Sequence, residues 1–99
     1  MNITIQSVRF TASDQLEQFV QQKVTKLDQF FDGIVKAEII LKLDKSDTTE
    51  NKIAEINLKL PGGELFSKKQ TKTFEEAADS ACDALRKQLI KWKEKVRAK

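Results

Sequence analysis

Polar and apolar residues alternate along four stretches of this 99-residue chain and recur at steps of three and four along two others. Alternation predicts strands, because successive side chains of a strand point to opposite faces of a sheet. The predicted strands cover residues 3–10, 34–44, 52–60 and 64–72. The first changes phase before Val8, and the second has the clearest alternation. The polar run 45–51 predicts a loop, and Pro61-Gly62-Gly63 predicts a tight turn.

Steps of three and four predict two amphipathic helices. The first begins after a possible N-cap, Ser13, and ends at Asp32-Gly33. Its apolar face comprises Leu16, Phe19, Val20, Val24, Leu27 and Phe31. The second begins at a T-x-x-E capping box formed by Thr73 and Glu76. Its apolar face comprises Phe74, Ala78, Ala81, Leu85, Leu89, Trp92 and Val96.

The element order is β-α-β-β-β-α, which predicts a parallel, right-handed crossover followed by hairpins. Each strand has one apolar side, so both helices are expected on the same face of the sheet. The predicted fold class is therefore an α/β two-layer sandwich with a four-stranded mixed sheet. Residues 1–99 are expected to form a single domain, since a chain of this length buries one core.

Composition leaves little material for catalysis. The chain has no His and no Tyr, and its one cysteine, Cys82, has no imidazole to activate it. We expect no enzyme activity, no metal site, no cofactor and no small-molecule substrate. The chain has no apolar run long enough for a membrane span and no secretory signal at its start, so we expect a cytoplasmic protein that does not bind membranes.

Positive charge is concentrated at the end of the chain. The basic residues there are Arg86, Lys87, Lys91, Lys93, Lys95, Arg97 and Lys99. With Glu94, residues 86–99 carry a net charge of +6, which leaves −3 on residues 1–85 of a chain whose total is +3. On a helix, Lys87, Lys91 and Lys95 form one row beside the apolar face, and Arg86, Lys93 and Arg97 line the other flank. Such rows indicate binding to a nucleic-acid backbone. The alternative is that this basic segment only makes the protein more soluble.

Two smaller sets of lysines extend this picture. Lys26 lies on the flank of the first helix, and Lys23 falls inside its apolar sector, so that its stem should be partly buried. If the helices are neighbours, both lysines can join the basic row of the last helix. Lys68, Lys69 and Lys72 are better explained as charges that protect an edge strand. We expect no aromatic platform on the open face of the sheet, which disfavours single-strand stacking.

The run Leu27-Asp28-Gln29-Phe30-Phe31-Asp32-Gly33-Ile34 resembles the L-[ED]-[QK]-[YF]-F-D-x-I signature of the ribosome hibernation-promoting factors, also called ribosome-associated inhibitors or sigma-factor modulation proteins. Gly62-Gly63-Glu64 and the segment from Ala77 to Lys93 are similar to the family in order and spacing. The resemblance implies a protein that binds ribosomal RNA in the cleft between head and body of the small subunit. There it would overlap the path of messenger and transfer RNA.

The resemblance also implies which residues bind ribosomal RNA. The matching family positions are Lys23, Lys26, Lys87, Lys91 and Lys93; the charge pattern adds Arg86, Lys95 and Arg97. The chain departs from the family at Ala84, where a lysine is usual, and at Glu17, where some members have a basic residue.

The expected function is that of a ribosome hibernation factor that inhibits translation in resting, stationary-phase or stressed cells and is monomeric when free. The chain ends with the last helix and resembles the short form, so we do not expect it to pair ribosomes on its own. Two alternatives stay open: a general binder of double-stranded RNA, and a protein-binding modulator of a transcription factor.

Overall fold

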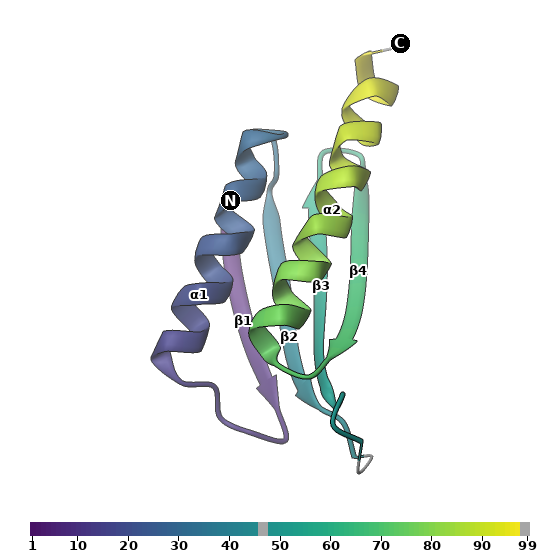
Figure 1. Cartoon of the computed structure of the whole chain (residues 1–99). Coiled ribbons are helices and arrows are strands. Elements are labelled where there is room, and N and C mark those ends of the chain that lie inside the picture. Colours follow the sequence, from purple (N-terminus) through teal and green to yellow (C-terminus); the bar gives the residue numbers. More distant parts are fainter. Residues whose placement is uncertain (46–47, 98–99) are drawn as a thin grey trace.

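A four-stranded sheet is covered on one face by two helices that lie side by side (Figure 1). This computed structural model describes residues 1–45 and 48–97, without the side chain of Arg97. The elements, in chain order, are β1 (Asn2–Val8), α1 (Asp14–Thr25), the 3-10 turn η1 (Lys26–Gln29), β2 (Lys36–Leu43), β3 (Lys52–Leu60), β4 (Gly63–Thr71) and α2 (Phe74–Arg97). The predicted fold class is confirmed. Of the predicted 45–51 loop, residues 46 and 47 lie outside the described part.

The strands follow the order β1-β2-β3-β4 across the sheet. β1 pairs with β2 in parallel, with Ile3 opposite Ala37, and α1 forms the crossover between them. β2, β3 and β4 pair as antiparallel neighbours. The crossover and the two hairpins therefore form as the element order predicts.

Both helices start with a side-chain cap. The Ser13 hydroxyl accepts a hydrogen bond from the Leu16 amide at 3.1 Å, and the Thr73 hydroxyl accepts one from the Glu76 amide at 3.1 Å. Each bond satisfies an amide that has no partner within its own helix. The two predicted helix starts are thus confirmed.

The first helix is shorter than its apolar periodicity predicts. α1 ends at Thr25 and tightens into η1, where the Phe30 amide donates to the Leu27 carbonyl at 3.0 Å. Such a 3-10 turn is common at the end of a helix. It brings Phe30 and Phe31 to the surface between the two helices instead of continuing one helical face. β1 also ends early, because Arg9 adopts a left-handed backbone with φ of 71°.

The core lies between the sheet and the helices. The buried residues of α2 include Ala77, Ala78 and Ala81, which are small and let the helix approach β3 and β4 closely. Trp92 packs over the turn between these strands, where a Cβ at Gly63 would meet its ring at 2.6 Å. The register and depth of α2 on the sheet are therefore fixed at both ends of its apolar face.

The open face of the sheet is mostly polar. Cross-strand ion pairs join Lys42 to Glu55 at 2.8 Å and Lys59 to Glu38 at 3.6 Å. Phe66 also points to this face, opposite Asn57, and is 51% exposed. Among the described residues, Phe66 is the one exposed aromatic side chain on this face. A single ring still provides no platform for successive bases.

Candidate nucleic-acid interface

α1, η1 and α2 enclose a shallow groove on the helical face of the molecule. Its volume is about 180 Å³. It is lined by Lys23, Lys26, Leu27, Phe30, Asp79, Cys82, Asp83 and Arg86. Of the residues predicted to bind RNA, the structure therefore brings Lys23, Lys26 and Arg86 together from separate elements.

Lys23 spans this groove from α1 to α2. Its side chain is 32% exposed, and its Nζ lies 3.1 Å from Asp79 Oδ1. The same Nζ lies 5.5 Å from the centroid of the Phe19 ring. As predicted, the apolar stem is partly buried and the ammonium reaches the surface. Lys26 is exposed and belongs to η1.

Asp83 organises the cations on the α2 side of the groove. It accepts hydrogen bonds from Arg86 Nη2 at 3.0 Å and from Arg86 Nε at 3.3 Å. Its second oxygen lies 3.6 Å from Lys87 Nζ. The Arg86 guanidinium also lies 5.9 Å from the centroid of the Phe30 ring. Arg86 is thus held between a carboxylate and an aromatic face, while Lys87 extends to solvent.

These contacts predict how Asp83 titrates. The hydrogen bonds from Arg86, together with the nearby charge of Lys87, hold the pKa of Asp83 below its ordinary value of 3.8. Because the pKa is lower in the folded protein, the resulting stabilisation is present above pH 3.8 and is lost as the pH falls through the folded pKa. We expect the Asp83 carboxyl carbon, followed by NMR, to titrate below this value in the natural chain. Arg86→Gln should return the midpoint toward 3.8, and an unchanged midpoint would contradict the contact.

The remaining predicted cations lie along α2. Lys87, Lys91 and Lys95 are exposed, and Lys93 is half-buried against the turn after η1. The structure does not bring Lys23 and Lys26 directly to the row of Lys87, Lys91 and Lys95; Arg86 lies nearest to them, and Asp83 joins Arg86 to Lys87. The Arg97 side chain and Lys99 lie outside the described part.

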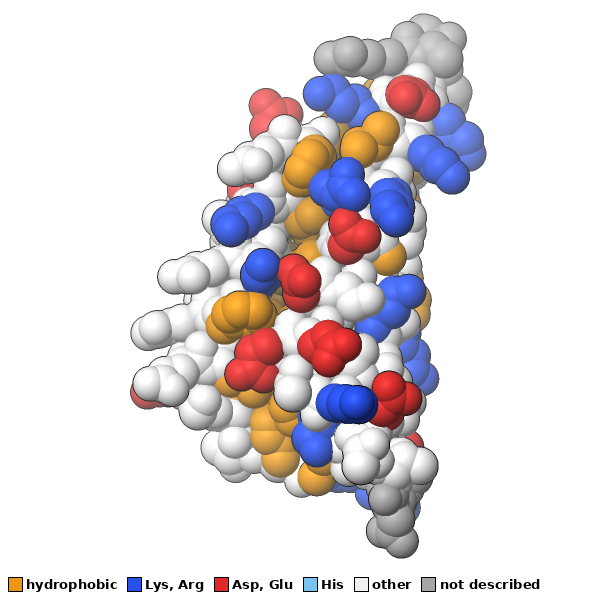
Figure 2. Space-filling view, in the orientation of Figure 1, with side chains coloured by type: hydrophobic (Ala, Val, Ile, Leu, Met, Phe, Trp, Pro, Cys, Tyr) orange, Lys and Arg blue, Asp and Glu red, His pale blue; other side chains and the backbone are white. Residues whose placement is uncertain are grey.

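Acidic side chains lie between the cations of the helical face (Figure 2), and the sequence pattern did not predict them there. In Figure 2, red and blue side chains alternate over the middle of the helical face, and blue ones gather toward the C-terminal end of α2. The pairing of Asp83 with Arg86 and Lys87 follows from spacings of three and four. The pair between Asp79 and Lys23 joins two helices and has no local signal.

Cys82 lies at the base of the groove and supplies no chemistry. Burial raises the pKa of its thiol to about 12, the nearby charge of Asp79 adds to the increase, and Lys23 opposes it. The thiol is therefore protonated and unreactive at neutral pH. Among residues 1–45 and 48–97, no cluster of three or more His, Cys, Asp or Glu side chains is arranged to hold a metal ion. In the same part of the chain no helix combines the length and apolar character of a membrane span.

Curated proteins align with the chain over nearly its full length. The ribosome hibernation promoting factor of Klebsiella oxytoca is 36% identical over 97 residues, covering 98% of this chain and 96% of that protein. The protein of the same name from Escherichia coli K12 is 33% identical over the same coverage.

Solved structures match the fold. The Protein Y N-terminal domain of Thermus thermophilus superimposes with a TM-score of 0.79 at 29% identity, covering 93% of this chain and 99% of that domain. A ribosomal subunit interface protein from Coxiella burnetii gives a TM-score of 0.85 at 24% identity, over 95% of this chain and 99% of that one, and supports the fold. The model of the Sigma 54 modulation protein / S30EA ribosomal protein family matches residues 3–97. With these relatives and this fold, the chain belongs to the Sigma 54 modulation protein / S30EA ribosomal protein family.

Proposed function

We propose that this protein is a ribosome hibernation factor that binds ribosomal RNA of the small subunit and inhibits translation in resting or stressed cells. One observation carries the proposal: the chain aligns with ribosome hibernation promoting factors over 98% of its length at 36% and 33% identity. The proposal extends to a cytoplasmic protein without enzyme activity that is monomeric when free.

The helical face supports RNA as the partner. Lys23, Lys26 and Arg86 line one groove, and the exposed lysines of α2 continue from it. Cations fixed on two packed helices present a rigid surface to phosphates, and each neutralised phosphate releases counterions. Asp79 and Asp83 interrupt this surface and disfavour indiscriminate binding to any polyanion.

We propose that inhibition occurs by occlusion. A protein bound in the path of messenger and transfer RNA fills space that both ligands need, and it requires no chemical step. The compact two-layer fold suits this role, since its core keeps both helices in a fixed relation.

Co-sedimentation with purified small subunits tests the function. We expect the protein to sediment with empty small subunits, to be released as the salt concentration rises, and to compete with messenger and transfer RNA. Equal affinity for a plain RNA duplex would favour a general binder of double-stranded RNA. Salt-insensitive binding to a protein in nuclease-treated extract would favour a modulator of a transcription factor. Failure to sediment with small subunits at low salt would contradict the proposal.

A further inference from the structure

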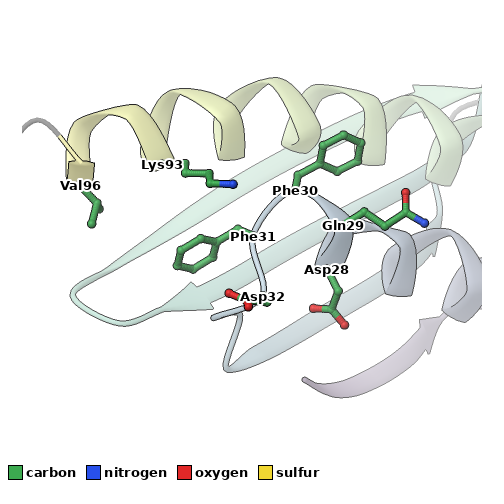
Figure 3. Close-up of a pocket in the computed structure, with 7 residues that line it drawn as sticks. All are labelled: Asp28, Gln29, Phe30, Phe31, Asp32, Lys93 and Val96. Carbon is green, nitrogen blue, oxygen red and sulfur yellow. The ribbon is translucent and has the colours of Figure 1, made fainter.

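Beyond the groove, the turn after η1 and the end of α2 enclose a second hollow (Figure 3). Its volume is about 440 Å³. It is lined by Asp28, Gln29, Phe30, Phe31, Asp32, Lys93 and Val96. A smaller hollow of about 300 Å³ also has Gln29, Phe30 and Lys93 in its lining, with Ile90 and Glu94.

The apolar part of this hollow is preformed. A Cβ at Gly33 would lie 2.8 Å from Cζ of Phe31, so the glycine backbone supports the ring at close range. The Arg86 guanidinium lies over the Phe30 ring, 5.9 Å from its centroid. Val96 is 53% exposed and Ile90 39% exposed at the border, which leaves apolar surface uncovered. The hollow therefore offers flat aromatic surface to a ligand without rearrangement.

The polar side chains of the hollow are unpaired. Among the described residues, the side chains of Asp28, Gln29, Asp32 and Lys93 have no hydrogen bond or ion pair with another part of the protein. In Figure 3 the Lys93 side chain extends along α2 in the direction of Phe30, on the α2 side of the Phe31 ring, while both carboxylates lie on the side away from α2. The hollow thus has a cation on the α2 side, two carboxylates on the opposite side, and the Phe31 ring between them (Figure 3).

We propose that this hollow receives one unpaired nucleobase that carries an exocyclic amino group, in the RNA bound by the basic face. The inference rests on the proposed function and adds a base-specific site to it. The base contacts Phe31 or Phe30, as bases do on aromatic side chains of RNA-binding proteins. Carboxylates accept hydrogen bonds from an amino group such as N4 of cytosine. Lys93 neutralises the phosphate of the same nucleotide.

Charge favours a nucleotide over the other occupants. Two carboxylates repel a phosphate, so the backbone stays on the side of Lys93 and the base enters. A basic peptide would pair with the carboxylates, but Lys93 and the neighbouring lysines of α2 would repel it. A base linked to a phosphate satisfies both sides of the hollow.

An NMR titration of the full chain tests this site with three related ligands: cytidine 5′-monophosphate, uridine 5′-monophosphate and ribose 5-phosphate. Amides of residues 28–32, 93 and 96 should shift saturably with the cytidine nucleotide. Affinity should be about tenfold lower for the uridine nucleotide, which has a carbonyl in place of the amino group. Ribose 5-phosphate should not move these amides. Equal responses to all three ligands would reduce the site to a phosphate contact and overturn the inference.

The double variant Asp28→Asn with Asp32→Asn removes the charge at nearly constant shape. It should abolish the preference for the cytidine nucleotide, whereas Glu50→Gln with Glu75→Gln, on exposed carboxylates outside the hollow, should retain it. If the variant at Asp28 and Asp32 keeps its preference for the cytidine nucleotide, the inference is overturned. It is also overturned if a lysine-rich peptide shifts the resonances of these amides and the cytidine nucleotide does not. Co-sedimentation of the natural chain with small subunits reports separately on the proposed function. If the chain sediments with small subunits but its amides do not respond to the nucleotides, the base-binding site is rejected and the proposed function stands. If the chain does not sediment with small subunits, the proposed function is rejected.

Discussion

Reversing the charge of Lys87 and Lys91 to Glu is expected to weaken binding to small ribosomal subunits by about a hundredfold at physiological salt. The Lys87 side chain is 67% exposed, and its ion pair to Asp83, at 3.6 Å, is long. Lys91 is exposed and has no ion pair among the described residues. Both cations are therefore available to phosphates, and each Glu replaces an attraction with a repulsion. The slope of log affinity against log salt should fall by about 2, the number of phosphate contacts removed.

The matched control is Lys68→Glu with Lys72→Glu. It changes the net charge equally, but Lys68 is on the open face of the sheet and Lys72 precedes α2. We expect this control to sediment with small subunits nearly as well as the natural chain. Its slope of log affinity against log salt should be close to that of the natural chain. Both variants change exposed residues, so their unfolding midpoints in urea should stay close to that of the natural chain. If the Lys87 and Lys91 variant still sediments with small subunits at moderate salt, these two lysines do not bind ribosomal RNA as proposed. An equal loss of affinity in the control would contradict the proposal in the same way.

The sequence was most informative where one face of an element is buried. β3 follows its predicted range, and β2 lies inside the predicted stretch, because strict alternation leaves a single register that buries Ile39 and Ile56. The end of β1 was missed because Arg9 turns the chain with a positive φ that its residue type does not predict. The end of α1 was missed because spacings of three and four suit both an α-helix and a final 3-10 turn.

The candidate site could be predicted only in its local part. Helical spacing orders the lysines of α2 from sequence, since neighbours three and four residues apart share a face. It does not reveal that Asp79 pairs with Lys23, or that Arg86 lies over Phe30, because those contacts depend on how two helices pack. The hollow beside Lys93 is also tertiary: Asp28 and Asp32 are more than sixty positions from Lys93 in the sequence.

The basic face depends on the core beneath it, and Leu85→Ala tests that dependence. Leu85 is 0% exposed and precedes Arg86 on α2, so it holds the cationic segment of the helix against the sheet. Its truncation leaves a cavity and is expected to reduce the free energy of unfolding by about 3 kcal/mol. The whole free energy of unfolding of a domain of this size is about 5–15 kcal/mol. Urea denaturation should give a lower midpoint at an unchanged slope.

Ile90→Ala is the matched control, because it removes an aliphatic side chain from the same helix at a residue that is 39% exposed. We expect it to reduce the free energy of unfolding by about 1 kcal/mol or less, since little packing is lost there. The folded fraction of Leu85→Ala at low temperature should still sediment with small subunits, because none of its cations has changed. The two variants then have different effects: Leu85→Ala lowers the stability of the fold, and charge reversal at Lys87 and Lys91 lowers the affinity for small subunits. Equal destabilisation by Leu85→Ala and Ile90→Ala would contradict the packing of α2 described here.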